Sequence, residues 1–535
     1  MLATPLFTMN VYDRVVPNLA FETLWVFVSA IVVVYLFDTL IKIARTHTVE
    51  VLSQKSDRLI SSRLFEHLLK IKLSENRLSV GEMMSRVKEF EYIRSFLTAT
   101  SLLALVDMPF VLLFLWVIFF IGGGLVVVPL VAGVMILLYS WIVSFPLRKS
   151  VKGLSGYQIQ KNELLIESLG ALETLKAFSM QEKQLNKWDE LIENLSQKSQ
   201  RSRLLSASVL TFSNLVIQLS TVAVLVLGVY AIAQQQLTMG GLIAIVMLTS
   251  RTLAPLHQLS GVINNYTHAK SAYKSLNELM RLPSDEQESD EAFYRKAFQG
   301  SIEFKEVYFK YPNEEQYALE GVSFKIELGE KVGIIGSNAS GKSTILKLIL
   351  GLYEPERGSV LIDGVEIGQY DSVALRESMG YLPQEVALFK GTIAQNIRNA
   401  VANVSDEVLL LAGKLSGLER FVAKHPKGYN RVINAQGVGL SGGEKASIGL
   451  ARIFAKSSSK VLLLDEPTDG MDSLNEALVT KSIAHFSKSR TLLIVSHKQQ
   501  LLGVAERLIL LERGKVLLDD KKATILELLK QKGQQ

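Results

Sequence analysis

The sequence of 535 residues predicts a multi-domain protein, with an all-α transmembrane domain over residues 1–280, a linker over 281–300 and an α/β domain over 301–535. The long apolar stretches lie before residue 280, and about 20 consecutive apolar residues are enough to cross a membrane. An acidic stretch, residues 284–291, marks the linker. From residue 301 onward, short apolar runs alternate with helical stretches, a pattern typical of a parallel α/β sheet.

Five stretches of the first domain are long and apolar enough to span a membrane. They are residues 24–43, 102–121, 125–145, 204–233 and 241–263. The apolar run at residues 2–9 is too short to span, and it lacks the basic region and cleavage site of a secretory signal. Five spans that end in the cytoplasm would place the start of the chain outside. A sixth span at residues 2–9 would put both ends of the domain in the cytoplasm. We therefore expect residues 2–9 to be the tail of a truncated first span.

Two long connections, residues 45–94 and 148–203, are rich in lysine and arginine, whereas the other two are short and uncharged. This bias places both long connections in the cytoplasm and explains the net charge of +6 without nucleic-acid binding. Their composition predicts helices that extend below the membrane, and basic loops without a role are the alternative. We expect coupling segments near their midpoints, at residues 171–176 and 80–87.

Composition and isolated charges limit the chemistry further. The chain has no cysteine, which excludes disulfides, thiolate metal sites and cysteine nucleophiles. Asp107 and Arg251 lie inside predicted spans, where ionisable side chains are costly and usually face a polar cavity. We expect both to face the translocation cavity and to pair with each other. Separate contacts with the membrane interface or with nearby backbone are the alternative.

A phosphate-binding pattern, G-x-x-x-x-G-K-S/T, follows a predicted strand at residues 331–335 and precedes a helix predicted from Thr344. Glycines in this pattern let backbone N–H groups close on phosphates, Lys342 neutralises phosphate charge, and Ser343 reaches Mg²⁺. A chance glycine-rich turn is the alternative for the pattern taken alone. The residues are Gly336, Ser337, Asn338, Ala339, Ser340, Gly341, Lys342 and Ser343.

Two further segments have the chemistry of a nucleotide site. Asp465 and Glu466 end an apolar strand at residues 461–464, where one carboxylate suits Mg²⁺ and the next can polarise an attacking water. Another phosphate-binding helix N-terminus is predicted at Ser441, Gly442, Gly443 and Glu444. Taken alone, the acid pair is also compatible with a helix cap, and the serine–glycine run with an ordinary loop and helix cap.

The order of these motifs resembles the nucleotide-binding domain of ABC transporters over most of residues 301–520. The resemblance implies that Gln384 senses Mg²⁺ and the γ-phosphate, that His497 is the switch histidine and that Asp472 lies in the D-loop. It also implies that Tyr311 stacks on adenine, although a plain strand aromatic is the alternative. ATP and Mg²⁺ are the expected cofactors. The residues expected to hold the metal are Ser343, Gln384 and Asp465. The implied assembly is a homodimer in which each ATP lies between the Walker A loop of one subunit and the L-S-G-G segment of the other.

The transmembrane domain is similar to the type I secretion permease/ATPases of the haemolysin-exporter type, within the subgroup linked to RTX adhesins. The segments that carry this resemblance are residues 5–18, 90–94, 105–110 and 237–242. It implies a bacterial inner-membrane exporter whose ATPase domain is cytoplasmic. It also implies a periplasmic adaptor (membrane fusion) protein, a TolC-like outer-membrane channel and a secreted protein as cargo.

Several positions depart from the family pattern. Glu444 stands where glutamine is usual, Ala339 replaces a glycine, Asn434-Ala435 replaces Gly-Glu, and Asp469-Gly470 replaces Ser-Ala. The start of the first span and the peptidase-like domain that often precedes it are absent, and the lack of cysteine excludes a cysteine peptidase. A lipid or drug exporter of the same fold, or a truncated ATP-binding subunit without transport, are therefore the alternatives.

Overall fold

The computed structural model describes residues 2–74, 78–97, 99–285, 298–312, 314–401 and 403–532. These residues form two compact units, which we call the helical unit (Met1–Leu69 and Leu78–Arg281) and the sheet unit (Lys70–Arg77 and Leu282–Gln535). Each unit is described by itself. Residues 286–297 of the predicted linker lie outside the described residues.

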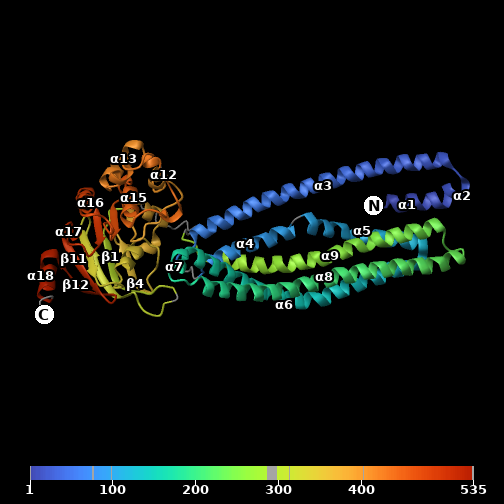
Figure 1. The fold of residues 1–535 in the computed structure, drawn as a ribbon, viewed down its shortest axis with the longest axis horizontal. Helices are drawn as coiled ribbons and strands as arrows, with labels where there is room; N and C mark the ends of the chain where they lie inside the picture. The colour runs from blue at the N-terminus through green and yellow to red at the C-terminus, as the bar shows by residue number, and fades with distance from the viewer. Residues whose placement is uncertain are drawn as a thin grey trace. The chain divides into compact units, whose positions relative to one another are not determined.

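The helical unit consists of long helices joined by short turns (Figure 1). Its long helices are α3 (Phe21–Lys70), α4 (Val80–Leu97), α5 (Ala99–Gly122), α6 (Val127–Gly170), α8 (Gln181–Ala233) and α9 (Met239–Met280). Both basic connections are largely helical, as predicted. Short elements complete the unit: α1 (Ala3–Asn10), the π-helical turn Val11–Val15, α2 (Val16–Asn18), the 3-10 turn Gly123–Val126 and α7 (Leu172–Ala177).

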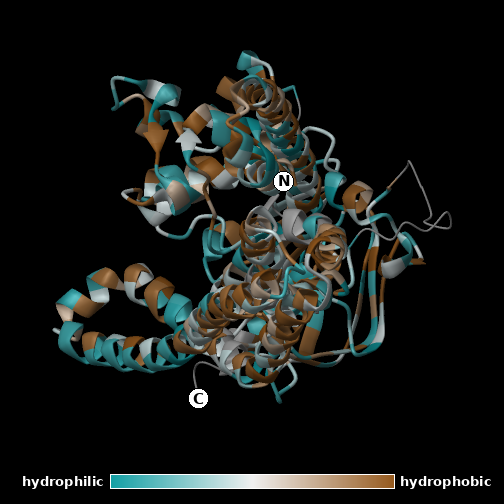
Figure 2. Ribbon diagram, turned by 90° about the vertical axis from the view of Figure 1, so that its right-hand side faces the viewer, coloured by the Kyte–Doolittle hydropathy of each residue, from teal (hydrophilic) through white to brown (hydrophobic). Residues whose placement is uncertain are grey.

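Four helical stretches among the described residues are long and apolar enough to cross a membrane: Phe21–Lys70, Asp107–Ser150, Gln181–Ala233 and Met239–Leu256. The second of them contains two predicted spans, because Gly123–Val126 reverses the chain between α5 and α6 (Figure 1). Figure 2 shows hydrophobic stretches along these helices. Large apolar side chains such as Trp25, Leu112 and Phe120 are exposed on them, as expected for surfaces that face lipid. The five predicted spans therefore all lie in helices.

The predicted span tail at residues 2–9 is the short helix α1, which packs against α9. Its Thr4 hydroxyl lies 2.9 Å from the Tyr35 hydroxyl of α3. The turn after α1 is anchored by Asp13, whose carboxylate accepts hydrogen bonds from the Gly240 N–H (2.8 Å) and the Thr238 hydroxyl (2.7 Å) at the start of α9. The first and last helices of the unit are thus joined directly.

The structure corrects the predicted pairing of the two charges inside the spans. Asp107 pairs with Arg45 of α3, at 3.0 Å between Oδ1 and Nη1, and the Arg251 guanidinium donates to the Thr4 hydroxyl at 3.1 Å. Both residues do line a cavity of about 530 Å³ within the helical unit, together with Asp38 and others. The pairing prediction is wrong, because helix packing brings Arg45 closer to Asp107. That this cavity belongs to the translocation path stays a prediction.

The sheet unit contains a six-stranded sheet in the order β12-β11-β3-β10-β9-β6 and a four-stranded antiparallel sheet in the order β2-β1-β4-β5. Strands β11 (Arg507–Glu512), β3 (Lys331–Gly336), β10 (Thr491–Val495), β9 (Val461–Asp465) and β6 (Met379–Leu382) are parallel, and β12 (Lys515–Lys521) is the antiparallel edge. The smaller sheet holds β1 (Ile302–Phe309), β2 (Leu319–Ile326), β4 (Arg357–Ile362) and β5 (Val365–Glu366). A separate pair joins β7 (Gly391–Thr392) and β8 (Val432–Ile433).

Two hydrophobic cores lie on the two faces of the parallel sheet. Side chains alternate along a strand, so β9 sends Val461 and Leu463 into one core and Leu462 and Leu464 into the other. The first core includes α10 (Lys342–Ile349) and both sheets, and the second includes α12 (Ile393–Arg398), α13 (Asp406–Leu415), α15 (Gly442–Ala455) and α16 (Ser473–Phe486). Shorter helices are α11 (Ser372–Glu377), α14 (Glu419–Val422), α17 (Gln499–Leu502) and α18 (Lys522–Lys532).

The segment that follows α3 belongs to the sheet unit. Ile71 forms an antiparallel bridge with Ser284, and the Lys72 N–H donates to the Pro283 carbonyl at 3.0 Å. The Lys72 ammonium also pairs with Glu354 at 2.8 Å. In the basic connection at residues 45–94, the chain therefore turns before the predicted coupling segment at residues 80–87. That segment forms the first turns of α4. In the other connection, residues 172–176 of the predicted segment 171–176 lie in the short helix α7.

Candidate functional site

Four neighbouring parallel strands deliver the predicted site residues to one edge of the sheet. The Walker A loop follows β3, His497 follows β10, Asp465 and Glu466 end β9, and Gln384 follows β6. Carboxyl ends of adjacent parallel strands meet at the same edge, where α/β proteins bind their ligands. Residues far apart in the sequence are thereby collected into one site.

The backbone of the Walker A loop requires glycine at two positions. Gly336 and Gly341 have positive φ angles of 153° and 98°. A Cβ atom would lie 2.1 Å from the Leu511 carbonyl oxygen at the first position and 2.6 Å from that of Ala318 at the second. Ala339 also takes a positive φ of 61°, which is costly for a residue with a side chain. The helix α10 begins at Lys342 rather than at the predicted Thr344.

The side chain of Lys342 folds back onto the Walker A loop. Its ammonium donates to the carbonyl oxygens of Gly336 (3.0 Å) and Ser337 (2.6 Å) and approaches the Ser340 hydroxyl at 3.5 Å. Burial lowers the pKa of Lys342, and the carboxylates of Glu466 and Asp465 oppose this shift. A partly desolvated cation beside backbone N–H groups at a helix N-terminus suits a bound phosphate.

Asp465 is buried at the end of β9, with 3% of its surface exposed. Burial raises its pKa, while the nearby Ser343 hydroxyl and the Lys342 charge act in the opposite direction. Among the described residues no three His, Asp or Glu side chains converge on a metal site. Three oxygen donors nevertheless fit Mg²⁺: the hydroxyl of Ser343, the carboxylate of Asp465 and the side-chain amide of Gln384. Mg²⁺ prefers such hard oxygen ligands and takes its remaining ligands from a nucleotide and from water.

Both carboxylate oxygens of Glu466 are oriented by the neighbouring strand. The Ser496 hydroxyl donates to Oε2 at 3.1 Å, and Nδ1 of His497 lies 2.9 Å from Oε1. Glu466 itself has a positive φ of 46° and a largely buried side chain, whereas His497 is mostly exposed. A carboxylate held in this way can accept a proton from a water molecule that approaches the site.

Tyr311 lies directly after β1 and contacts the Walker A helix. Its hydroxyl lies 3.1 Å from the Thr344 hydroxyl, and the Lys347 ammonium lies 5.3 Å from the centre of its ring. The ring packs edge-on against Phe309 and Tyr353 at centroid distances of 5.0 and 5.3 Å. Tyr311 is therefore neither a free surface aromatic nor part of a strand.

The L-S-G-G segment, residues 440–443, lies at the start of α15. Ser441 and Glu444 form a capping box, because the Ser441 N–H donates to the Glu444 carboxylate at 2.8 Å and the Glu444 N–H donates to the Ser441 hydroxyl at 3.3 Å. Gly442 is exposed. A Cβ atom on Gly443 would lie 2.5 Å from the Gly470 carbonyl oxygen, so the D-loop backs this segment. Asp472 caps α16 by accepting from the Asn475 N–H at 2.8 Å.

Comparison with known proteins decides the family. The ABC transporter family model matches residues 319–469, and the model of the ABC transporter transmembrane region matches residues 1–256. The cyclolysin secretion/processing ATP-binding protein of Bordetella pertussis is 31% identical over 96% of this chain and 72% of its own length. The chain belongs to the ABC transporter family. The alpha-hemolysin translocation ATP-binding protein of Escherichia coli O157:H7 is 30% identical with the same coverage, and a leukotoxin translocation ATP-binding protein of a Pasteurella haemolytica-like species is 30% identical over 98% of this chain and 74% of its own length.

The fold of this ABC transporter matches that of a solved structure described as a bacterial Atm1-family ABC exporter with ATP bound. The TM-score is 0.89 with 23% sequence identity, over 98% of this chain and 93% of the other. The predicted fold class is thus confirmed: an all-α transmembrane domain followed by an ABC ATPase domain. The protein is a multi-pass inner-membrane exporter whose cytoplasmic domain binds nucleotide and couples ATP hydrolysis to transport.

Sequence reasoning missed three residues of the ABC transporter's site. Ser496 orients Glu466, and Lys347 and Tyr353 surround Tyr311. A signal existed for Ser496, because a small polar residue at the end of an apolar strand, beside His497, points to the same sheet edge. Lys347 and Tyr353 gave no signal, since their approach to Tyr311 depends on how α10 packs against the smaller sheet.

Proposed function

We propose that this ABC transporter is the permease/ATPase subunit of a type I secretion system that exports an RTX-type protein or adhesin. The observation that carries the proposal is the similarity, over nearly the whole chain, to proteins named for secretion or translocation of cyclolysin, alpha-hemolysin and leukotoxin. The intact set of Lys342, Asp465, Glu466 and His497 at one sheet edge supports active transport over the alternative of an inactive ATP-binding subunit.

In the proposed site the Walker A loop, residues 336–343, binds the phosphates of ATP with its backbone N–H groups and Lys342. The Mg²⁺ ligands are Ser343, Gln384 and Asp465, and the ion would neutralise developing phosphate charge. Thr344 and Tyr311 form the adjoining wall, with Tyr311 against adenine. The position of Ser343 in the first turn of α10, near enough to the buried Asp465 to lower the pKa of its carboxyl, supports these roles.

Glu466 is the proposed group that polarises the attacking water. Its orientation by Ser496 and His497 supports this role, because a fixed carboxylate loses no free energy to reorientation during the reaction. His497, which is exposed at this edge, is placed to contact the γ-phosphate as well. Gln384 lies exposed after β6 and would move with the nucleotide state.

The proposed assembly is a homodimer. Ser441, Gly442, Gly443 and Glu444 lie at the N-terminus of α15. Ser441 and Gly442 are exposed there, which supports their action on the nucleotide of the other subunit. Asp472 and the D-loop back this segment through the contact of Gly470 with Gly443. A periplasmic adaptor and a TolC-like outer-membrane channel are the proposed partners that complete the export path.

One experiment tests this function in the native bacterium. The gene is deleted and then restored either as the wild type or as Glu466→Gln, and the proteins in the culture medium are compared by mass spectrometry. We expect a large secreted protein to disappear on deletion, to return with the wild type and not to return with Glu466→Gln. The purified variant should bind ATP and lose hydrolysis by roughly 100-fold or more. Unchanged secreted proteins with altered lipids or drug sensitivity would favour the lipid or drug exporter instead.

A further inference from the structure

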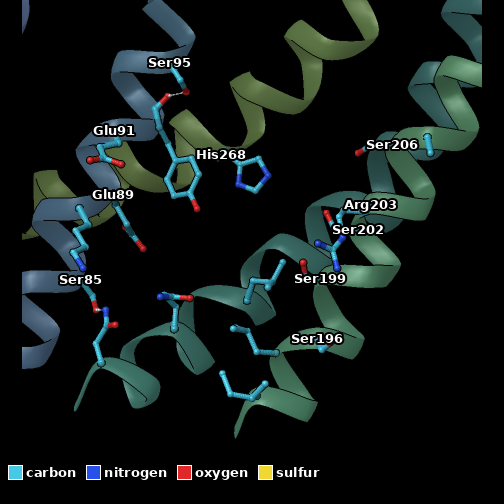
Figure 3. A pocket seen from close by; sticks show the side chains of 18 of the residues that line it. Ser85, Glu89, Glu91, Ser95, Ser196, Ser199, Ser202, Arg203, Ser206 and His268 are labelled. Carbon is cyan, nitrogen blue, oxygen red and sulfur yellow. Dashed lines mark hydrogen bonds between the residues drawn. The ribbon is translucent and has the colours of Figure 1, made fainter. Parts of the chain in front are cut away.

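A polar cavity of about 1100 Å³ lies within the helical unit, between α4, α6, α8 and α9. Pockets that hold small organic ligands have volumes of about 300 to 1000 Å³, so this cavity can take several residues of a peptide. Figure 3 shows labelled residues of α4 on one side, those of α8 on the other and His268 between them. Most of the residues that line it are polar or charged, and apolar side chains such as Leu195 and Leu210 complete the wall.

The α4 wall holds a carboxyl group with one unpartnered oxygen. Among the described residues, Oε2 of Glu89 is buried without a hydrogen-bond partner. Burying such a group costs free energy unless a partner is supplied, and an ionised carboxylate can only accept hydrogen bonds. Glu91 on the same helix adds a second, exposed carboxylate to the lining. Lys88 on the same helix also lines the cavity and is exposed. The missing partner of Glu89 is a hydrogen-bond donor, and a cationic donor forms the strongest hydrogen bond with a carboxylate.

Two stacked rings lie beside these carboxylates. The rings of Tyr92 and His268 have centroids 5.1 Å apart and an interplanar angle of 20°. Burial lowers the pKa of His268, so its ring is neutral at physiological pH and does not compete with a cation. The face of a tyrosine ring attracts ammonium and guanidinium groups. The rings and the carboxylates thus favour the same kind of group.

The α8 wall offers hydrogen bonds of a different kind. Its hydroxyl groups recur every three or four residues and therefore share one face of the helix. Arg203 adds a guanidinium next to them, which can only donate. Such a row suits the carbonyl and N–H groups of an extended polypeptide. The hydroxyl groups belong to Ser196, Ser199, Ser202 and Ser206.

We propose that this cavity binds a basic side chain of a polypeptide segment, with its cation at Glu89 and its backbone along the α8 serines. The proposal rests on the proposed function, because it takes the exported cargo to be a protein. It adds to that function a preference of this cavity for a lysine or arginine side chain of the exported polypeptide. Most of the lining residues come from the two basic connections, Ser206, Ala207 and Leu210 come from the start of the predicted span 204–233, and His268 comes from α9 beyond its candidate span.

The absence of cysteine allows a direct test in the full-length protein, reconstituted in lipid nanodiscs. Ser199→Cys places one thiol on the α8 wall, and its labelling by a neutral maleimide is timed. The probes are ten-residue glycine–serine peptides with a central arginine or, as the matched control, its neutral isostere citrulline. We expect the arginine peptide to protect the thiol at roughly tenfold lower concentration, the typical effect of a charge-assisted hydrogen bond. Glu89→Gln should abolish this difference, whereas Glu91→Gln should largely keep it, because that carboxylate is solvated.

Asn186→Cys, an exposed position on α8 outside the cavity, controls for effects on maleimide access, and neither peptide should protect it. Equal protection by both peptides, or a difference that survives Glu89→Gln, would overturn the proposal. A Ser199→Cys thiol that does not react at all in the assembled exporter would also overturn it, since a second copy of the chain would then fill the cavity. Secretion of the cargo by the same protein is measured separately, so a failed cavity and a failed export function are distinguished.

Discussion

The carboxylate of Asp13 accepts a hydrogen bond from the backbone N–H of Gly240 at 2.8 Å, across 227 positions of sequence. Gly240 lies in the first turn of α9, where N–H groups have no partner within the helix. Asp13 therefore supplies a cap, and a favourable negative charge, from a different segment. Two of the segments that resemble type I secretion permeases, residues 5–18 and 237–242, meet in this contact.

Asp13→Ala should lower the free energy of unfolding of the helical unit by about 1 to 3 kcal/mol, because two donors lose a charged acceptor. All four tryptophans lie in this unit, so tryptophan fluorescence during denaturant titration in detergent reports on it. Glu22→Ala removes an exposed carboxylate from the first turn of α3 and should change stability by less than about 0.5 kcal/mol. Equal effects of the two variants would contradict the capping role.

Asp465→Asn should change the pH dependence of stability. Burial raises the pKa of Asp465 above 3.8, so above that pH the folded state keeps a proton that the unfolded state has lost. The contribution of this group to the free energy of unfolding then falls as the pH rises through that interval. The melting temperature of the variant relative to the wild type, measured by calorimetry, should therefore increase from about pH 4 upward. Asp520→Asn, at an exposed site on β12, controls for simple loss of charge, and a pH-independent difference for Asp465→Asn would refute the argument.

Ala339→Gly should stabilise the sheet unit. A non-glycine residue in the left-handed region, such as Ala339, destabilises the folded state by about 1 to 2 kcal/mol. Glycine relieves this strain, but its greater freedom in the unfolded chain offsets about half of the gain. We expect a net gain of up to about 1 kcal/mol in calorimetric unfolding. Ala374→Gly in the right-handed helix α11 should instead cost about 1 kcal/mol. A destabilising Ala339→Gly would show that the alanine is not strained.

The bridge between Ile71 and Ser284 should accept an engineered disulfide. The N–H of Lys72 bonds to the carbonyl of Pro283, and that of Asp285 to Lys70, so Ile71 and Ser284 form a non-hydrogen-bonded antiparallel pair. Such pairs have Cα atoms about 4.5 Å apart, within the range of disulfides. The double variant Ile71→Cys with Ser284→Cys should therefore oxidise in air, as measured by loss of maleimide labelling.

Lys72→Cys with Ser284→Cys is the matched control, since successive side chains of an extended segment point to opposite sides and Lys72 faces Glu354. This pair should stay reduced. The first pair remaining reduced in every nucleotide state would rule out the contact between the end of α3 and the segment after α9.

Much of the fold and part of the site could be predicted from the sequence, because the signals are local. A membrane span needs only a long apolar run, so every predicted span lies in a helix. The Walker A loop needs a strand, a glycine-rich turn and a helix in immediate succession, and Gly336 and Gly341 take the backbone angles that this turn requires. The spacing from Ser441 to Glu444 is also that of a capping box, and the structure forms this box at the start of α15.

Relationships across the chain were decided only by tertiary structure. The sequence identified Asp107 as a costly charge within a span but not Arg45 as its partner, because the rotation of each helix depends on packing along its whole length. Likewise, the order of the strands brings Ser496 to Glu466, and only the docking of α1 brings Asp13 to Gly240. Sequence patterns specify which residues are buried, charged or conformationally constrained. Which of them meet depends on the sum of many weak contacts between distant segments, and no local pattern records that sum.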